Sequence, residues 1–285
     1  MPELAHHQRM PHGTTPAPES LKTIGQWLFL AAILAFGFQQ LIFVFSLHLP
    51  MPGPPWTQHY LVSALLTALV LIGVTLTTII RPKATTWAAA LLALLLFIRP
   101  LVVYAPGLFA NLHDPAPWTS GFELLCLCGA SLSLINASPS QLHGAAFAAR
   151  GNTTRIGQLL FAAGLIVFGT QHFLYADFIT TLIPTWIPLR LFSAYFVGLA
   201  FFATAISIIS KKKTVFGATL LGAMFLLWVA GLHSPRVFHA YKNGNEWTSL
   251  LIALAMGGAS LIIAGTTQTA ERHADSTSDA LATTA

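Results

Sequence analysis

His172 is the residue whose type and position most suggest chemistry. It stands in Gln171-His172-Phe173-Leu174-Tyr175-Ala176-Asp177, where a long apolar run ends. An imidazole there can donate or accept a hydrogen bond, bind a metal or titrate near neutral pH. The alternative is a structural histidine at a membrane interface, satisfied by Asp177 or by a backbone carbonyl. His172 is therefore a ligand-binding candidate, and the structural alternative stays open.

The segment 233–247 offers the densest set of useful side chains: two imidazoles, two cations, one carboxylate and aromatic rings. A guanidinium such as that of Arg236 can hold an anionic or carbonyl-bearing head group through paired hydrogen bonds. Anchoring at the membrane interface is the alternative, since Trp, Tyr and Arg favour that depth. Together with two charged residues earlier in the chain, the ligand-binding candidates are His172, Asp177, Arg190, His233, Arg236, His239, Glu246 and Trp247.

Two opposite charges lie inside apolar runs. Arg99 is near the end of one run and Glu123 near the beginning of the next, so antiparallel neighbouring helices could bring them together. Ionisable residues inside a membrane are costly and are functional candidates by default. We predict an ion pair between Arg99 and Glu123 that fixes helix pairing, with a role in ligand binding or proton transfer as the alternative.

Motifs for metal binding and catalysis are missing. Cys126 and Cys128 would point to opposite sides of a helix, which disfavours a disulfide or a shared metal, and no metal site is predicted. His172 and His233 raise the question of a bis-imidazole haem, but structural histidines are far commoner and haem is not expected. There is no Walker A motif, dinucleotide fingerprint, nucleophile elbow or His-Glu-x-x-His, so no catalytic residue or enzyme class is assigned.

The elements that must position these residues are membrane spans. Of the 285 residues 55% are hydrophobic and only 8% charged, against about 25% charged in an average soluble domain. A spanning helix needs about 20 mostly apolar residues. The chain is therefore predicted to be all-α and polytopic, with eight transmembrane helices near 26–47, 60–80, 86–104, 120–138, 156–176, 190–210, 214–233 and 248–266.

The basic residues predict the orientation. With the N-terminus inside, ten of the fourteen lysines and arginines fall in cytoplasmic segments and four fall outside. The positive-inside rule then places both termini in the cytoplasm of a cell whose inner (plasma) membrane holds the chain. The net charge of +5 is explained in the same way, without nucleic acid. The candidate site residues all map to the opposite, outer side, which in a bacterium is periplasmic.

An internal repeat divides the chain. Phe36-Gly37-Phe38-Gln39-Gln40 matches Phe168-Gly169-Thr170-Gln171-His172, and in the register that aligns Lys83 with Lys212, Trp118-Thr119-Ser120 matches Trp247-Thr248-Ser249. Each copy holds four spans, an even number, so the copies should run parallel. The predicted organisation is a polar N-terminal tail (1–25), a first four-helix repeat (26–138), a cytoplasmic linker (139–155), a second repeat (156–266) and a disordered C-terminal tail (267–285).

The second half, about 157–263, resembles the DoxX family of small four-span bacterial membrane proteins. The resemblance rests on Phe168-Gly169-x-Gln171-His172-Phe173, the Ile183-Pro184-x-Trp186-Ile187-Pro188 connector, Lys211-Lys212-Lys213, and His233-x-Pro235-Arg236 through Asn245-Glu246-Trp247-Thr248. The first half looks like a diverged copy, with Gln40 in place of His172. Some family members are associated with quinone-linked sulfur oxidation and redox-stress complexes, so the resemblance implies a quinone or redox link.

Three functions follow as hypotheses. The first is a redox-associated membrane component that binds a quinone-like or other small molecule at the outer mouth of the second repeat, with a redox partner protein. The second is a small-solute carrier, suggested by the repeat. The third is a non-catalytic scaffold for a partner protein. The carrier ranks below the first because the cytoplasmic halves of the spans hold almost no ionisable residue.

Overall fold

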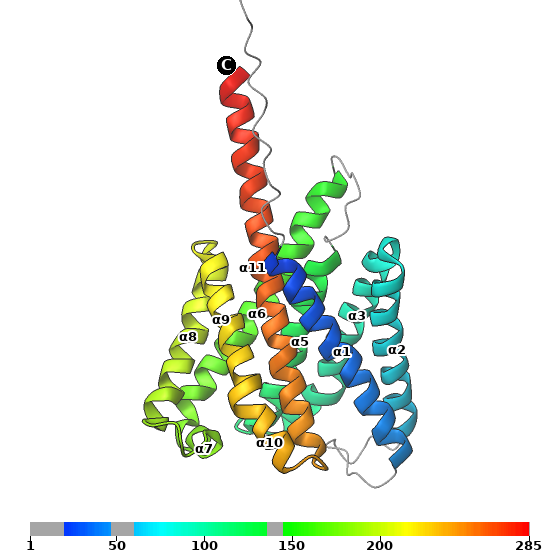
Figure 1. Ribbon diagram of the computed structural model, residues 1–285, viewed down its shortest axis with the longest axis vertical. Coiled ribbons are helices and arrows are strands. Elements are labelled where there is room, and N and C mark those ends of the chain that lie inside the picture. The colour runs from blue at the N-terminus through cyan, green and yellow to red at the C-terminus, as the bar shows by residue number, and fades with distance from the viewer. Residues whose placement is uncertain (1–19, 47–59, 136–144, 285) are drawn as a thin grey trace, which may run out of the picture.

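The computed structural model describes residues 20–46, 60–135 and 145–284, and all regular structure in these ranges is helical (Figure 1). Lipid leaves backbone groups without water partners, so a helix, which satisfies its own backbone, suits such apolar runs. The α-helices are α1 (Ser20–Ser46), α2 (Tyr60–Ile80), α3 (Thr85–Arg99), α4 (Ala105–Ala110), α5 (Pro115–Ile135), α6 (Ala145–Leu174), α7 (Ala176–Leu182), α8 (Arg190–Ser210), α9 (Thr214–Trp228), α10 (Ser234–His239) and α11 (Gly244–Thr284).

Three short helical segments complete the described chain. The 3-10 turn η1 (Pro82–Ala84) precedes α3, and the π-helical segments η2 (Pro100–Tyr104) and η3 (Val229–His233) join α3 to α4 and α9 to α10. Counting α3–η2–α4 and α9–η3–α10 as one segment each, eight helical segments of the described chain are long and apolar enough to cross a bilayer. The all-α prediction is thus confirmed for the described residues, and the eight segments that are long and apolar enough to span fit a multi-pass integral membrane protein.

Several predicted boundaries differ from the structure. Residues 267–284 were predicted to be a disordered tail, but α11 runs on to Thr284. After Gly265 this stretch contains neither Gly nor Pro, so nothing in it breaks a helix. The second part of the predicted linker 139–155 is also helical, because α6 begins at Ala145. Helix α1 begins at Ser20, inside the predicted tail 1–25, whose residues 1–19 lie outside the described part, as do residues 139–144 of the linker.

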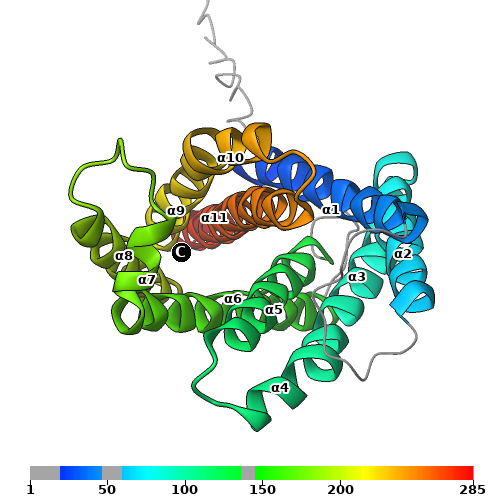
Figure 2. The same ribbon diagram turned by 90° about the horizontal axis from the view of Figure 1, so that it is seen from below.

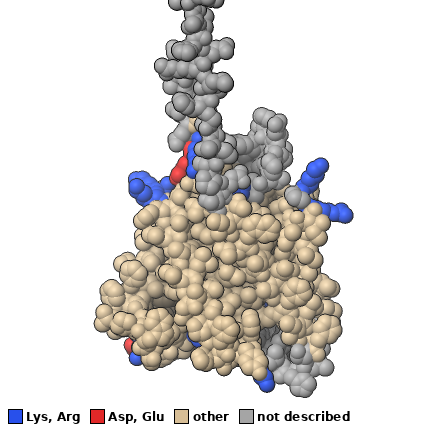
Figure 3. Space-filling model, viewed as in Figure 1, with Lys and Arg blue, Asp and Glu red and all other residues tan. Residues whose placement is uncertain are grey.

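The described chain begins and ends at the same end of the bundle, which we call the tail end (Figure 1). Helices α1 and α6 both start there and run toward the opposite end, where α7 and α10 lie, called the α7 end. The most extensive pairings are α1 with α11 and α5 with α6, seen side by side in Figure 2. Lys and Arg side chains gather at the two ends, with an uncharged band between them on the face shown in Figure 3.

Small residues allow these close pairings. A Cβ built on Gly258 of α11 would lie 2.8 Å from the carbonyl oxygen of Gly25 in α1. The same relation joins Gly129 of α5 and Gly157 of α6, where a Cβ on either residue would meet the carbonyl oxygen of the other. Backbones approach this closely in membrane bundles only where the side chain is minimal. The two seams therefore depend on glycine.

The two halves share local geometry. In the register that aligns Lys83 with Lys212, α3, η2 and α4 begin and end at residues aligned with the bounds of α9, η3 and α10. The indole nitrogen of Trp118 donates to the Leu112 carbonyl at 3.0 Å, and that of the aligned Trp247 donates to the Tyr241 carbonyl at 2.9 Å. Equal sequence thus produces the same contact between the first turn of the helix and the preceding loop at α5 and at α11.

Arg155 of α6 caps the last turn of α8. Its Nη1 donates to the Ile208 carbonyl at 2.7 Å and its Nη2 to the Ile209 carbonyl at 2.8 Å. The last carbonyls of a helix lack intrahelical donors, and a cation there also favours the helix dipole. Arg155 therefore locks the tail end of α8 onto α6.

We expect Arg155→Ala to lower the thermal unfolding midpoint in detergent by several degrees. Hydrogen bonds to a charged group contribute about 1.5–3 kcal/mol, and each kcal/mol shifts the midpoint of a chain this large by roughly 2–4 °C. Arg155→Lys should recover only part of the loss, because an ammonium lacks the fork that reaches two carbonyls. Lys212→Ala, at an exposed position of the same end, is the control; an equal drop in both alanine variants would contradict the capping role.

Candidate functional site

A cavity of about 1130 Å³ opens within the α7 end of the bundle. Its walls come from α5, α6, α8, α9, η3 and α11, and α7 with the following connector lies across its end. The lining is mainly apolar and aromatic, with rings from Phe168, Phe201, Phe225 and Trp228. Phe201, Phe225 and Trp228 pack against one another with centroids 5.3–6.3 Å apart, which gives this wall a defined shape. A cavity of this size and polarity suits a small organic ligand.

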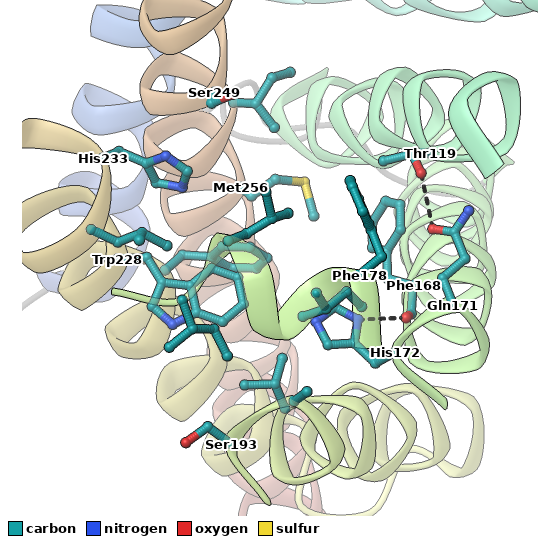
Figure 4. A pocket seen from close by; sticks show the side chains of 18 of the residues that line it. Thr119, Phe168, Gln171, His172, Phe178, Ser193, Trp228, His233, Ser249 and Met256 are labelled. Carbon is teal, nitrogen blue, oxygen red and sulfur yellow. Dashed lines mark hydrogen bonds between the residues drawn. The ribbon is translucent and has the colours of Figure 1, made fainter. Parts of the chain in front are cut away.

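His172 of α6 lies on the cavity wall. Its Nδ1 is 2.8 Å from the carbonyl oxygen of Phe168, one turn earlier, and its ring meets the edge of Phe201 at a centroid distance of 5.2 Å. The predicted alternative of a backbone carbonyl satisfying the ring is thus correct for one nitrogen. The other side of the ring faces the cavity (Figure 4). His172 is therefore both anchored and available to a ligand.

His233 reaches the same cavity from the π-helical segment η3 (Figure 4). Pro235 follows it, and a proline lacks an N–H and crowds the preceding turn, which favours the wider π turn closed by the Ser234 N–H and the Val229 carbonyl. The Nδ1 of His233 is buried and has no hydrogen-bond partner among the described residues. A buried polar atom without a partner is costly, so this nitrogen is a second place for a ligand to bind.

Glu123 of α5 also lines the cavity, although we predicted it as the partner of Arg99. That ion pair is not formed: Arg99 Nη1 instead donates to Thr67 Oγ1 of α2 at 3.0 Å. In the structure α3 turns Arg99 toward α2, while Glu123 of α5 lines the cavity together with residues of α6 and α11. The Glu123 carboxyl makes no hydrogen bond or ion pair within the described part of the chain. It is the third polar group on the cavity wall.

Arg236 lines the mouth of the cavity and is held by Glu246. Its Nη2 donates to Glu246 Oε1 at 2.9 Å, and its Nε lies 2.9 Å from Oε2. The pair is partly buried, with 35% of the Arg236 side chain and 15% of the Glu246 side chain exposed. This contact joins α10 to the first turn of α11. Arg236, predicted to bind a ligand directly, thus has a carboxylate partner of its own.

The remaining candidates lie around the cavity and do not line it. Asp177, Arg190 and His239 are exposed at the α7 end. Trp247 is 42% exposed and its indole N–H bonds to Tyr241, as described above. The structure therefore brings together His172, His233 and Arg236 from the predicted set, with Glu246 behind Arg236, and leaves the other four outside.

Several polar residues of the wall were not predicted. Thr119 of α5 donates to Gln171 Oε1 at 3.0 Å, and Gln171 Nε2 donates to the Pro115 carbonyl at 3.1 Å. Gln39 makes the corresponding contacts in the other half, to the Gly244 carbonyl and the Thr248 hydroxyl. The sequence did carry a signal for these contacts: Gln39 and Gln171 occupy the same position in the two matching motifs. A polar residue that recurs inside a predicted span needs a hydrogen-bond partner. These contacts tie each half to the other at the α7 end.

Some of the side chains that line the cavity are also exposed on the surface of the bundle. Phe178, Trp186 and Leu227 line it and yet are 61%, 69% and 70% exposed. Such residues form a wall one side chain thick between α7, the connector and α9. On this side the cavity is therefore closed by side chains alone.

Toward the tail end the core closes. Fully buried apolar residues fill it, with Phe161 and Leu165 from α6 and Ile262 and Ile263 from α11. Within the described residues no group of three or more His, Cys, Asp or Glu could hold a metal ion, and Cys126 and Cys128 are buried, unbridged thiols.

Comparisons of the chain with protein-family models, with curated proteins and with solved structures find no match.

Proposed function

We propose that this membrane protein binds a lipid-soluble, ring-bearing molecule of the quinone type in the cavity at its α7 end. The observation that carries the proposal is the composition of the wall. His172, His233 and Glu123 face a space that is mainly apolar and aromatic, with Gln171 and Arg236 among the other polar residues of its wall. We take the side closed by the exposed residues Phe178, Trp186 and Leu227 to border the bilayer. Aromatic walls suit a flat ring, the polar groups suit its oxygen substituents, and the side next to the bilayer suits a hydrophobic tail.

We also propose that the fold is two parallel four-helix repeats related by an axis along the membrane normal. Support comes from the aligned bounds of α3–η2–α4 and α9–η3–α10, the reciprocal contacts of Gln39 and Gln171, and the paired glycine seams. The shared direction of α1 and α6 in Figure 1 agrees with a parallel arrangement. The ten basic residues at one side favour a plasma-membrane location with both termini in the cytoplasm, which places the cavity in the outer half of the bilayer.

In the cell the protein would act as a DoxX-like, redox-associated component that presents its bound ligand to a partner protein. The resemblance of residues 157–263 to that family supports the assignment, together with the cavity at His172. The packed apolar core between the cavity and the tail end supports ligand binding over solute transport, since a carrier needs a polar path between the two faces.

A lipid-extract mass spectrum and an absorption spectrum of the protein, purified in mild detergent from its membranes, test this proposal. We expect a near-stoichiometric isoprenoid quinone in the extract of the native chain and a loss of at least about ten-fold in His172→Phe, the loss that one well-made polar contact supports. His239→Phe, at an exposed position away from the cavity, is the matched control and should retain the ligand. An extract without any quinone-class molecule would overturn the proposal, and a haem spectrum would replace it.

A further inference from the structure

We infer that the cavity recognises a ligand that brings a hydroxyl to His172, so that the phenolic, reduced form of a quinone-type ring binds better than the oxidised form. The inference rests on the proposed function and adds the chemical state of the ligand. It comes from the hydrogen bonds around His172 and Glu123. For these two side chains the described contacts determine which atoms are left to accept a hydrogen bond from a ligand.

The first step is the tautomer of His172. A backbone carbonyl oxygen can only accept, so the 2.8 Å contact with Phe168 requires the proton to sit on Nδ1. No carboxylate of the described chain forms an ion pair with this histidine, and the neutral imidazole is the relevant form. In a neutral imidazole with Nδ1 protonated, Nε2 is a bare acceptor. Nε2 of His172 can therefore form a hydrogen bond only with a ligand atom that donates one.

Glu123 adds a second acceptor on the neighbouring helix α5. Its carboxyl oxygens line the cavity and have no donor among the described residues. A carboxyl group keeps at least one acceptor oxygen in either protonation state. A ligand with hydroxyls can satisfy both Glu123 and His172. A carbonyl oxygen can accept from a protonated Glu123 but has no proton to donate to Nε2 of His172, so His172 is the group that separates the two ligand forms.

The donors in the cavity do not reverse this preference. Trp228, Arg236 and Ser249 of the wall carry donors. The indole N–H of Trp228 makes no hydrogen bond to another described residue, the Arg236 guanidinium directs its Nε and Nη2 to Glu246, and the Ser249 hydroxyl can donate or accept. A phenolic hydroxyl accepts as well as donates, so it serves these groups too. Only the acceptor Nε2 of His172 distinguishes the two ligand forms, and it favours the hydroxyl.

The size of the preference follows from what is left unpaired. A site built to hydrogen-bond a hydroxyl rejects an analogue without it, because the buried acceptor is then left without a partner. The Nε2 of His172 is one such acceptor, and one unpaired acceptor corresponds to a discrimination of about ten-fold. We therefore expect the reduced ring to bind at least about ten-fold more tightly than its oxidised counterpart.

The test compares three probes that differ only in the head group. A decyl-substituted 1,4-hydroquinone, the corresponding quinone and the corresponding 1,4-dimethyl ether are dialysed anaerobically against the purified protein in detergent micelles, and bound probe is quantified by mass spectrometry. The ether keeps the aromatic ring and removes the donors, so it separates ring aromaticity from hydrogen bonding. We expect the hydroquinone to bind at least about ten-fold more tightly than both other probes.

Two variants test whether His172 is the source of the preference for the hydroquinone. His172→Phe should bring the three affinities within about three-fold of one another, and His239→Phe should leave the order unchanged. If His172→Phe does not yield folded protein, the order of the three probes on the native chain still decides. Equal binding of all three, or a preference for the quinone, would overturn this inference while leaving the proposed function standing. If none of the probes binds, the proposed function fails and the inference fails with it.

Discussion

Replacing Gly258 by valine is expected to prevent the chain from reaching the described fold. A Cβ at this position would lie 2.6 Å from the amide nitrogen of Phe29 and 2.8 Å from the carbonyl oxygen of Gly25. Extra atoms in a packed core cost about 1–3 kcal/mol when neighbouring side chains can move. Here the opposing atoms are backbone, so α1 and α11 must separate along the most extensive interhelical pairing of the bundle. We expect a loss at or above the upper end of that range.

The measurement is the fraction of membrane-extracted protein that elutes as a single symmetrical peak on size-exclusion chromatography in mild detergent. Gly258→Val should abolish most of that peak, and Gly157→Val should do the same at the α5–α6 seam. Gly73→Val is the matched control: it lies in the middle of α2, and no atom stands within 4 Å of its built Cβ. Normal recovery of Gly258→Val would show that the two helices are not in close contact.

The span pattern could be predicted because hydrocarbon imposes a length and a composition on each helix. The windows near 190–210 and 214–233 match α8 and the α9–η3 run almost residue for residue. Hydrocarbon sets no length or composition for the part of a helix that extends beyond the bilayer. The continuation of α11 to Thr284 was missed for that reason. Apolar runs report where a membrane begins and ends, but they say little about helices in water.

Several residues of the cavity could be named from the sequence, but the direction in which each side chain points could not. The sequence placed Arg99 and Glu123 at similar depths, and the structure turns one toward Thr67 and the other toward the cavity. That direction depends on how far each helix is rotated about its axis, and rotation follows from packing, with η2 and η3 adding a wider turn in each half. The partners of Arg236 and Gln171 were missed for the same reason.

Removing the charge of Arg236 is expected to destabilise the protein more than removing its partner. Arg236→Ala leaves the Glu246 carboxylate, with only 15% of its side chain exposed, without a counter-charge. Breaking a buried pair in this way costs about 3–5 kcal/mol; partial exposure of Arg236 brings the expected loss nearer the lower value. Glu246→Ala costs less, because an arginine that is already 35% exposed can carry its charge into the polar interface on its long stem.

Thermal unfolding midpoints in one detergent rank the variants of this pair. We expect Arg236→Ala to fall furthest, Glu246→Ala less, and the double variant Arg236→Met with Glu246→Leu to recover part of the loss, because it leaves no unpaired charge. Lys242→Ala, an exposed cation that stands 5.7 Å from the Tyr241 ring, should change little. If Glu246→Ala proves the more damaging single change, then the unpaired Arg236 guanidinium costs more than the unpaired Glu246 carboxylate, and the ranking based on the exposure of the two side chains is wrong.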